Sequence, residues 1–152
     1  MKLLVATAIE TPAMAAVHAE AFDACWRKDE FEDLLEGEGI FGALAVAADQ
    51  PLGVILCRIA ADEMEVLTLG VAPRARRSGV GLALMEAALT VARQRAAAAA
   101  FLEVDVANAA AVALYERLGF QRSGLRKAYY DRGLAGRADA LVMRLDLGAQ
   151  PA

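Results

Sequence analysis

The chain has 152 residues, of which 58% are hydrophobic and 24% charged, a composition typical of a folded globular protein. This length suits a single domain with a substantial core, which we expect to span residues 1–152. The net charge of −4 argues against general nucleic-acid binding, so any contact with a polyanion must be local.

Membrane insertion and metal binding are not expected from this sequence. No apolar stretch reaches the roughly 18 residues that span a bilayer, and the N-terminus does not have the pattern of a signal peptide. Cys25 and Cys57 stand apart in a chain that has no CxxC pair and only one histidine. This pattern favours neither a zinc site nor a disulfide framework. We expect two buried or half-buried reduced thiols, no metal, and a cytoplasmic location.

Six segments of the N-terminal half have strand or helix patterns. In chain order they are a strand at 3–9, helices at 12–24 and 29–39, and strands at 41–48, 51–60 and 63–73. Thr11 and Pro12 are typical of a helix start, as N-cap and first-turn residue. A turn at 49–51 joins the second and third strands into a hairpin, and Pro73 stops the next strand.

The C-terminal half continues with a long helix and a final set of strands. Its expected elements are a helix at 80–96, a strand at 101–106, a helix at 109–118, and strands at 120–130 and 138–147. The alanine run 96–100 is interpreted as the end of the long helix. Asn108 and Gly119 suit the N-cap and C′ positions of the shorter helix. This order indicates an α/β fold, a mixed sheet with helices on both faces.

The segment RRSGVGLALMEAAL, residues 76–89, places basic residues and two glycines directly before the long helix. The first N–H groups of a helix are unpaired and its dipole favours an anion there. Glycine removes the side chain that would hinder approach to the backbone. Together with Arg74, Arg76 and Arg77, this arrangement predicts a cradle for a phosphate.

Two familiar phosphate loops fit this segment poorly. A P-loop needs Lys followed by Ser or Thr after its last glycine, and neither follows Gly81. A dinucleotide fingerprint needs a third glycine near the position of Leu84. An ordinary helix start with incidental glycines does not explain three arginines within four residues.

Residues 67–85, LTLGVAPRARRSGVGLALM, resemble the acetyl-CoA motif of the GNAT superfamily of N-acetyltransferases. In that family a strand ends at V-x-P, and R/Q-x-x-G-x-G/A opens the long helix; Arg76, Gly79 and Gly81 fall on those positions. The resemblance implies acetyl-CoA as co-substrate and a mostly antiparallel, twisted GNAT sheet. The residues implied to bind it are Arg76, Arg77, Ser78, Gly79, Val80, Gly81 and Leu82 at the pyrophosphate, and Leu69, Gly70 and Val71 along the pantetheine arm. Gly70 departs from the alanine-like residues usual there.

Residues 102–130, LEVDVANAAAVALYERLGFQRSGLRKAYY, are similar to the RimI type of this superfamily, the ribosomal-protein-alanine N-acetyltransferases. The resemblance implies acetyl transfer to a protein N-terminus, the N-terminal alanine of a small-subunit ribosomal protein. It assigns the role of base to Glu103, while Asp105 on the same strand face is the internal rival. The alternative for both is a solvated strand acid.

Three further positions have implied roles in this resemblance. Tyr115 is the candidate acid, because a phenol with a pKa near about 10 stays protonated at neutral pH and can donate to a leaving thiolate. Asn108 caps its helix and is implied to offer its amide to the CoA arm. Either Tyr129 or Tyr130 lines the acceptor groove, since neighbours on a strand face opposite ways. The alternatives are a packed core ring for Tyr115 and capping alone for Asn108.

The acceptor is the least determined part of the prediction. Six acids between residues 29 and 38 suit a solvated helix face, or attraction of a basic peptide tail. The other readings are a GNAT enzyme for a small metabolite, an antibiotic or a lysine, and an inactive module that binds acyl-CoA. His18 is given no role, and Trp26 is expected to be a packing anchor.

Overall fold

The computed structural model describes the backbone of residues 1–131 and 137–148, and the side chains of 1–126 and 139–148. The strands are β1 (Lys2–Val5), β2 (Ile40–Ala47), β3 (Gln50–Ala60), β4 (Glu63–Val71), β5 (Ala99–Asp105), β6 (Gln121–Asp131) and β7 (Arg137–Asp146). The α-helices are α1 (Thr11–Ala21), α2 (Lys28–Leu35), α3 (Val80–Gln94) and α4 (Ala109–Arg117), with short 3-10 helices η1 (Ala8–Glu10) and η2 (Pro73–Ala75).

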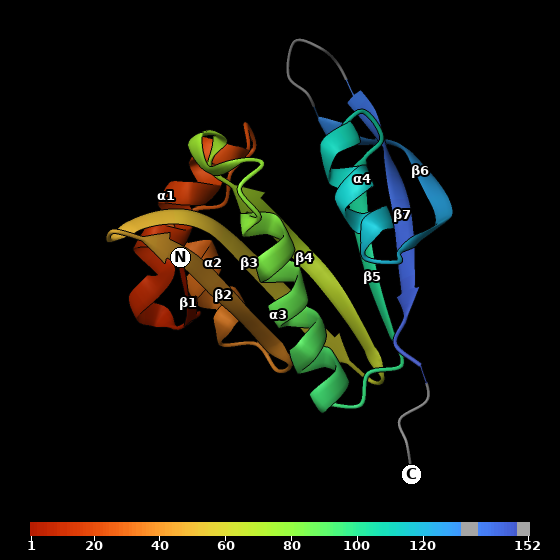
Figure 1. Cartoon of the computed structure of the whole chain (residues 1–152), viewed down its shortest axis with the longest axis horizontal. Helices are drawn as coiled ribbons and strands as arrows, with labels where there is room; N and C mark the ends of the chain where they lie inside the picture. Colours follow the sequence, from red (N-terminus) through yellow and green to blue (C-terminus); the bar gives the residue numbers. More distant parts are fainter. Residues whose placement is uncertain (132–136, 149–152) are drawn as a thin grey trace.

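The strands form one sheet in the order β1-β2-β3-β4-β5-β7-β6. All neighbouring strands are antiparallel except β4 and β5, which are parallel. Helices α3 and α4 lie on one face of the sheet, and α1 and α2 lie on the other (Figure 1). The mixed, mostly antiparallel sheet with helices on both faces is therefore confirmed.

Local sequence explains the tight connection between β2 and β3. Ala48 and Asp49 have positive φ angles of 49° and 63°, as a two-residue hairpin turn requires. The turn thus falls one residue earlier than expected, and Pro51 belongs to β3. Pro51 pairs with Val46 beside an irregularity in the β2–β3 register, a position that tolerates a strand proline.

The first strand and the first helix are shorter than expected. The strand stops at Val5 because Thr7 and Glu10 make a capping box that opens η1: the Thr7 N–H donates to Glu10 Oε1 at 2.8 Å. Glu10 then occupies the N-cap position of α1, and Thr11 is its first helical residue. The expected cap at Thr11 is wrong, since its hydroxyl donates to the Ala8 carbonyl instead.

The alanine run is the largest correction to the expected elements. Helix α3 ends at Gln94, and Ala96 has a φ of 58° that reverses the chain. Ala99 and Ala100 then open β5 and pair with Glu63 and Met64. Sheet pairing and near-complete burial of these two alanines outweigh their preference for a helix.

The core lies between the sheet and its two helical layers. Its largest fully buried side chains include Phe31, Ile55, Leu84, Met85 and Met143, from α2, α3 and the central strands. Gly53 allows close packing of α3, because a Cβ there would lie 2.8 Å from Val80 Cγ1. Cys57 is buried as expected, but Cys25 is exposed, so the expectation of two buried thiols is wrong for Cys25.

Candidate functional site

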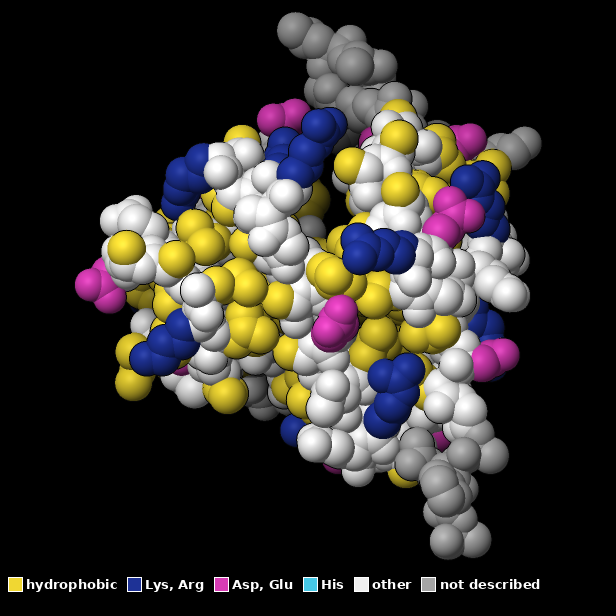
Figure 2. Space-filling model, viewed as in Figure 1, with side chains coloured by type: hydrophobic (Ala, Val, Ile, Leu, Met, Phe, Trp, Pro, Cys, Tyr) yellow, Lys and Arg dark blue, Asp and Glu magenta, His cyan; other side chains and the backbone are white. Residues whose placement is uncertain are grey.

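The parallel pair β4 and β5 separates along its length. Pairing is confined to Glu63–Glu65 with Ala99–Phe101, although β4 continues to Val71 and β5 to Asp105. The two strands diverge beyond this seam in Figure 1, and Figure 2 shows a hollow between the two halves of the molecule. Leu69, Gly70 and Val71 pair with β3 on one side only, so their other edge is open for an extended chain.

The glycine-rich segment lies at the end of β4, where the strands are apart. Gly79 has a φ of 84° and would meet nothing within 4 Å if it carried a Cβ, so its backbone is open to a ligand. A Cβ on Gly81 would lie 3.7 Å from Val71 Cγ2 and 3.2 Å from Leu114 Cδ2. This glycine therefore brings the start of α3 against both β4 and α4.

The rest of the predicted phosphate cradle consists of two exposed arginine side chains and of backbone amides at the start of α3. Arg76 and Arg77 are exposed and make no ion pair with the described residues. Arg77 has a φ of 64°. The Ser78 hydroxyl donates to the Ala75 carbonyl. Val80 is buried and Leu82 half-buried, so these two offer backbone amides, as the first turn of a helix does.

Arg74 differs from the other two arginines in that it pairs with protein groups. Its guanidinium is bound to the Glu20 carboxylate of α1 and donates to the Pro51 carbonyl at 2.7 Å. Glu20 belongs to α1 and Pro51 to β3, so the contacts of Arg74 hold η2 against both of these elements. Unlike Arg76 and Arg77, Arg74 therefore has its guanidinium engaged by protein groups, and its expected contact with the phosphate stays a prediction.

Glu103 and Asp105 share the face of β5 opposite the buried Leu102 and Val104, as predicted. Glu103 is half-buried, and its Oε1 accepts from Arg126 Nη1 of β6 at 2.6 Å. Asp105 Oδ1 accepts the Ala107 N–H at 2.9 Å and so closes the turn after the strand. Asp105 thus stabilises the turn at the end of β5.

Tyr115 and Asn108 both come from α4. Tyr115 is 6% exposed and its ring meets Phe120 edge-on, with the ring centroids 6.0 Å apart. Asn108 Oδ1 accepts the Ala111 N–H at 3.2 Å, so its capping role is confirmed. Helix α4 lies on the same side of the sheet as α3 (Figure 1). Tyr115 belongs to the core cluster that contains Leu102 and Val104, whose face of β5 is opposite to that of Glu103.

The side chains of Tyr129 and Tyr130 lie outside the described residues, so their expected contact with the acceptor remains a prediction. Their backbone belongs to β6, where Tyr130 pairs with Ala138.

Sequence reasoning missed a cluster around His18, between α1 and β4. The His18 ring is 2% exposed and packs against Phe22, Trp26 and Phe31. Its Nδ1 accepts the Trp26 N–H at 3.0 Å, so Nε2 carries the hydrogen and donates to Thr68 Oγ1 at 2.9 Å. Trp26 is a packing anchor, as expected, and a lone histidine in a helix gave no signal for this cluster.

The same cluster explains the unusual Gly70. A Cβ at this position would lie 2.9 Å from Phe22 Cε2 and 3.1 Å from the Ala21 Cβ. Glycine therefore lets the end of α1 lie directly on β4, two residues from Thr68. The segment after α1 thus packs against β4, the strand that has one unpaired edge at residues 69–71.

Acidification is expected to destabilise the fold through His18. Burial lowers the pKa of His18 to about 4, and the negative charge of Glu30 offsets part of this effect. The unfolded chain binds this proton below about pH 6.5, so unfolding takes up a proton between pH 6.5 and 4. Stability is then complete above pH 6.5 and falls by about 2 kcal/mol on going to pH 5. Urea unfolding across this range should show a steeper decline for the wild type than for His18→Gln; equal declines would contradict the assignment.

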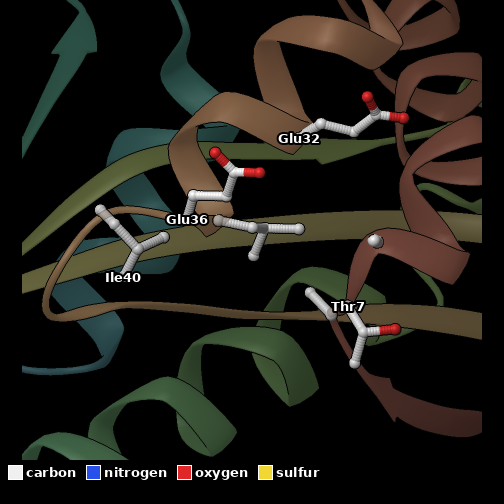
Figure 3. Close-up of a pocket in the computed structure, with 7 residues that line it drawn as sticks. Thr7, Glu32, Glu36 and Ile40 are labelled. Atoms are coloured by element: carbon white, nitrogen blue, oxygen red, sulfur yellow. The ribbon is translucent and has the colours of Figure 1, made fainter.

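A separate pocket of about 310 Å³ lies between η1, α2 and the start of β2. Figure 3 shows Glu32 and Glu36 on its α2 side, with Thr7 and Ile40 opposite. Glu32 is half-buried and paired with Lys28 at 2.5 Å, and the other five acids of the tract are exposed, as a solvated helix face predicts. None of the residues predicted to hold acetyl-CoA lines this pocket.

Comparison with known proteins agrees with this geometry. Residues 7–120 match the acetyltransferase (GNAT) family, a span that includes the open edge of β4, the start of α3, and Glu103 and Tyr115. The chain belongs to the GNAT acetyltransferase family. Members of this family use acetyl-CoA as co-substrate, and the chain has the fold that the family motif predicted.

Several GNAT relatives are N-terminal acetyltransferases. The ribosomal protein bS18-alanine N-acetyltransferase of Escherichia coli K12 is 38% identical over 92 residues, 60% of this chain and 62% of that protein. The N-alpha-acetyltransferase RimI of Mycobacterium tuberculosis is 45% identical over 57% of this chain and 51% of that protein. The aligned region thus spans less than two thirds of these relatives. The crystal structure of the E. coli ribosomal-protein-S18-alanine N-acetyltransferase superposes with a TM-score of 0.88 at 28% identity, covering 99% of this chain and 97% of that one.

None of the described helices is long and apolar enough to cross a membrane. In the same part of the chain, no three His, Cys, Asp or Glu side chains come together as a metal site would require.

Proposed function

We propose that this GNAT protein transfers acetyl directly from acetyl-CoA to the α-amine of a protein N-terminus. The observation that carries the proposal is the divergence of β4 from β5, with the start of α3 at its open end. An open strand edge suits the amides of the pantetheine arm, and the helix start suits a pyrophosphate. The residues proposed to bind acetyl-CoA are Leu69, Gly70, Val71, Arg76, Arg77, Ser78, Gly79, Val80, Gly81, Leu82 and Asn108.

In the proposed reaction, Glu103 takes a proton from the acceptor ammonium, directly or through a water molecule. The neutral nitrogen attacks the thioester carbonyl carbon, a C–N bond forms, and the C–S bond breaks. Tyr115 donates its proton to the departing thiolate of CoA, and the new amide nitrogen gives up its second proton through solvent, which restores the Tyr115 phenol. No acylated enzyme is needed in this sequence. Cys57 is buried within β3 and Cys25 lies beyond the end of α1, outside the residues proposed to bind acetyl-CoA.

The acidity of the acceptor favours an N-terminus over a lysine. An α-amine has a pKa near about 8, so its deprotonation at neutral pH costs about 1 kcal/mol. A lysine, with a pKa near about 10.4, costs roughly 4 to 5 kcal/mol, which is a heavier demand on one carboxylate. The names of the bS18-alanine relatives support an alanine-starting ribosomal protein as the acceptor. We place the enzyme in the cytoplasm, where a ribosomal substrate is found.

Mass spectrometry of two matched peptides tests the proposal. One is short, basic and begins with a free alanine; the other has the same sequence with a blocked N-terminus and a free lysine. With acetyl-CoA, the wild-type protein should acetylate only the free N-terminus. Acetylation of the lysine would assign a different acceptor. Binding of acetyl-CoA without transfer to either peptide would favour a small-molecule acceptor or a binding module.

A further inference from the structure

We infer that Arg126 is a positioning residue for catalysis, because it fixes the carboxylate of Glu103. This inference rests on the proposed function, in which Glu103 is the base. The Arg126 Nη1 and Glu103 Oε1 atoms are 2.6 Å apart, a short charge-assisted hydrogen bond. The two residues are 23 positions apart in sequence and come from strands that are not neighbours in the sheet.

The register of the sheet explains how the pair forms. Asp105 of β5 faces Ala140 of β7, which in turn faces Arg126 of β6, so these three lie in one row. Glu103 stands in the adjacent row with Val142 and Gly124. The long arginine side chain thus reaches from its own row on β6, past Ala140 on β7, to the row of Glu103 on β5. Ala140 on β7 and Gly124 on β6 present little or no side chain beside this path.

Arg126 and both acids lie on one face of the sheet. Arg126 Nη1 donates to Glu103 Oε1, and Asp105 Oδ1 accepts the Ala107 N–H. Other charged groups on the same face are Arg144, which lies over the Phe101 ring at 4.9 Å, and Glu65, which is paired with Arg58. Arg126 is the ion-pair partner of Glu103 among the described side chains, so its loss frees the carboxylate to rotate.

The chemical benefit is a fixed direction for proton transfer. A glutamate side chain has several rotatable bonds, and a half-buried one without a partner samples many rotamers. Arg126 holds Oε1, so Oε2 is the oxygen available for the acceptor proton or for a bridging water. General-base catalysis requires the base within hydrogen-bond reach of that proton, and orientation of this kind raises kcat more than it changes binding.

The test compares Arg126→Met, Arg126→Lys and Arg122→Met in steady-state assays with acetyl-CoA and the alanine-starting peptide. Methionine keeps length and removes the donor, so we expect kcat to fall about tenfold with KM for both substrates within about twofold. Lysine keeps a positively charged donor for Glu103 Oε1 and should restore most of kcat. Arg122 lies on the same strand but pairs with Glu116, so Arg122→Met should leave kcat unchanged.

A double-substitution cycle with Glu103→Gln separates positioning from other effects. If Arg126 acts through Glu103, Arg126→Met should cause no further loss of kcat in the Glu103→Gln background. Equal losses in both backgrounds, or a rise in peptide KM alone, would overturn the inference and leave the proposed function intact. An inactive wild type would overturn the proposed function and this inference together.

Discussion

Replacement of Glu103 by glutamine is expected to lower kcat by about 100-fold or more, since general-base catalysis contributes roughly 10² to 10⁴ in rate. Glutamine keeps the size of the side chain and can still accept from Arg126, but it cannot take a proton from the acceptor amine. Its effect should therefore fall on the chemical step. Steady-state kinetics with the alanine-starting peptide, together with calorimetry for acetyl-CoA, measure the two parts separately.

The rival carboxylate supplies the control for this experiment. Asp105 accepts the Ala107 N–H at the end of β5, so Asp105→Asn should cost some stability and leave kcat within a few-fold of wild type. If instead Asp105→Asn abolishes transfer and Glu103→Gln does not, the base is Asp105. A wild-type rate in both variants would mean that neither carboxylate takes the proton.

Removal of the Tyr115 hydroxyl is expected to reduce kcat by roughly 10- to 100-fold, because departure of a thiolate then lacks its proton donor. The Tyr115→Phe substitution keeps the ring, which is buried and packed against Phe120, so the core around α4 should be preserved. The affinity for acetyl-CoA should change by less than about threefold. Single-turnover assays and calorimetry are the measurements that separate these quantities.

A different result would show that Tyr115 serves only as a packed core residue. In that case Tyr115→Phe would leave kcat unaltered, or would lower thermal stability and activity in parallel. Phe120→Leu offers a matched comparison, because it disturbs the same buried contact from the other side without touching a hydroxyl group. A kcat loss confined to Tyr115→Phe therefore identifies a role for the hydroxyl itself.

Local sequence signals predicted the structure correctly where the residues that determine an element lie close together in the chain. Helix α4 begins after Asn108 and is followed by Gly119 with a φ of 99°, as the N-cap and C′ preferences predict. The alternation around Glu103 also placed that carboxylate on the correct face of β5. The motif at the start of α3 identified the family for the same reason, because its requirements are contained within one strand–turn–helix unit.

Contacts between distant segments could not be predicted in the same way. The sequence of Ala99 and Ala100 favours the end of a helix. These residues form a strand because they pair with β4, which lies much earlier in the chain. Arg74 belongs to a basic cluster in sequence, but Glu20 and Pro51 bind it only after folding brings α1 and β3 beside it. The partners of His18 and Glu103 likewise depend on topology, since Thr68 and Arg126 are 50 and 23 residues away.

The three-residue seam between β4 and β5 couples occupancy of the proposed site to the cohesion of the whole sheet. It is the only strand–strand ladder, among the described residues, that joins the β1–β4 half to the β5–β7 half. A ligand that runs along the open edge of β4 acts as an additional, removable strand between these halves. Its binding free energy then contributes to the resistance of the sheet to separation, through RT ln(1 + [L]/Kd). A concentration of acetyl-CoA above its Kd is therefore expected to raise the free energy of unfolding of this protein.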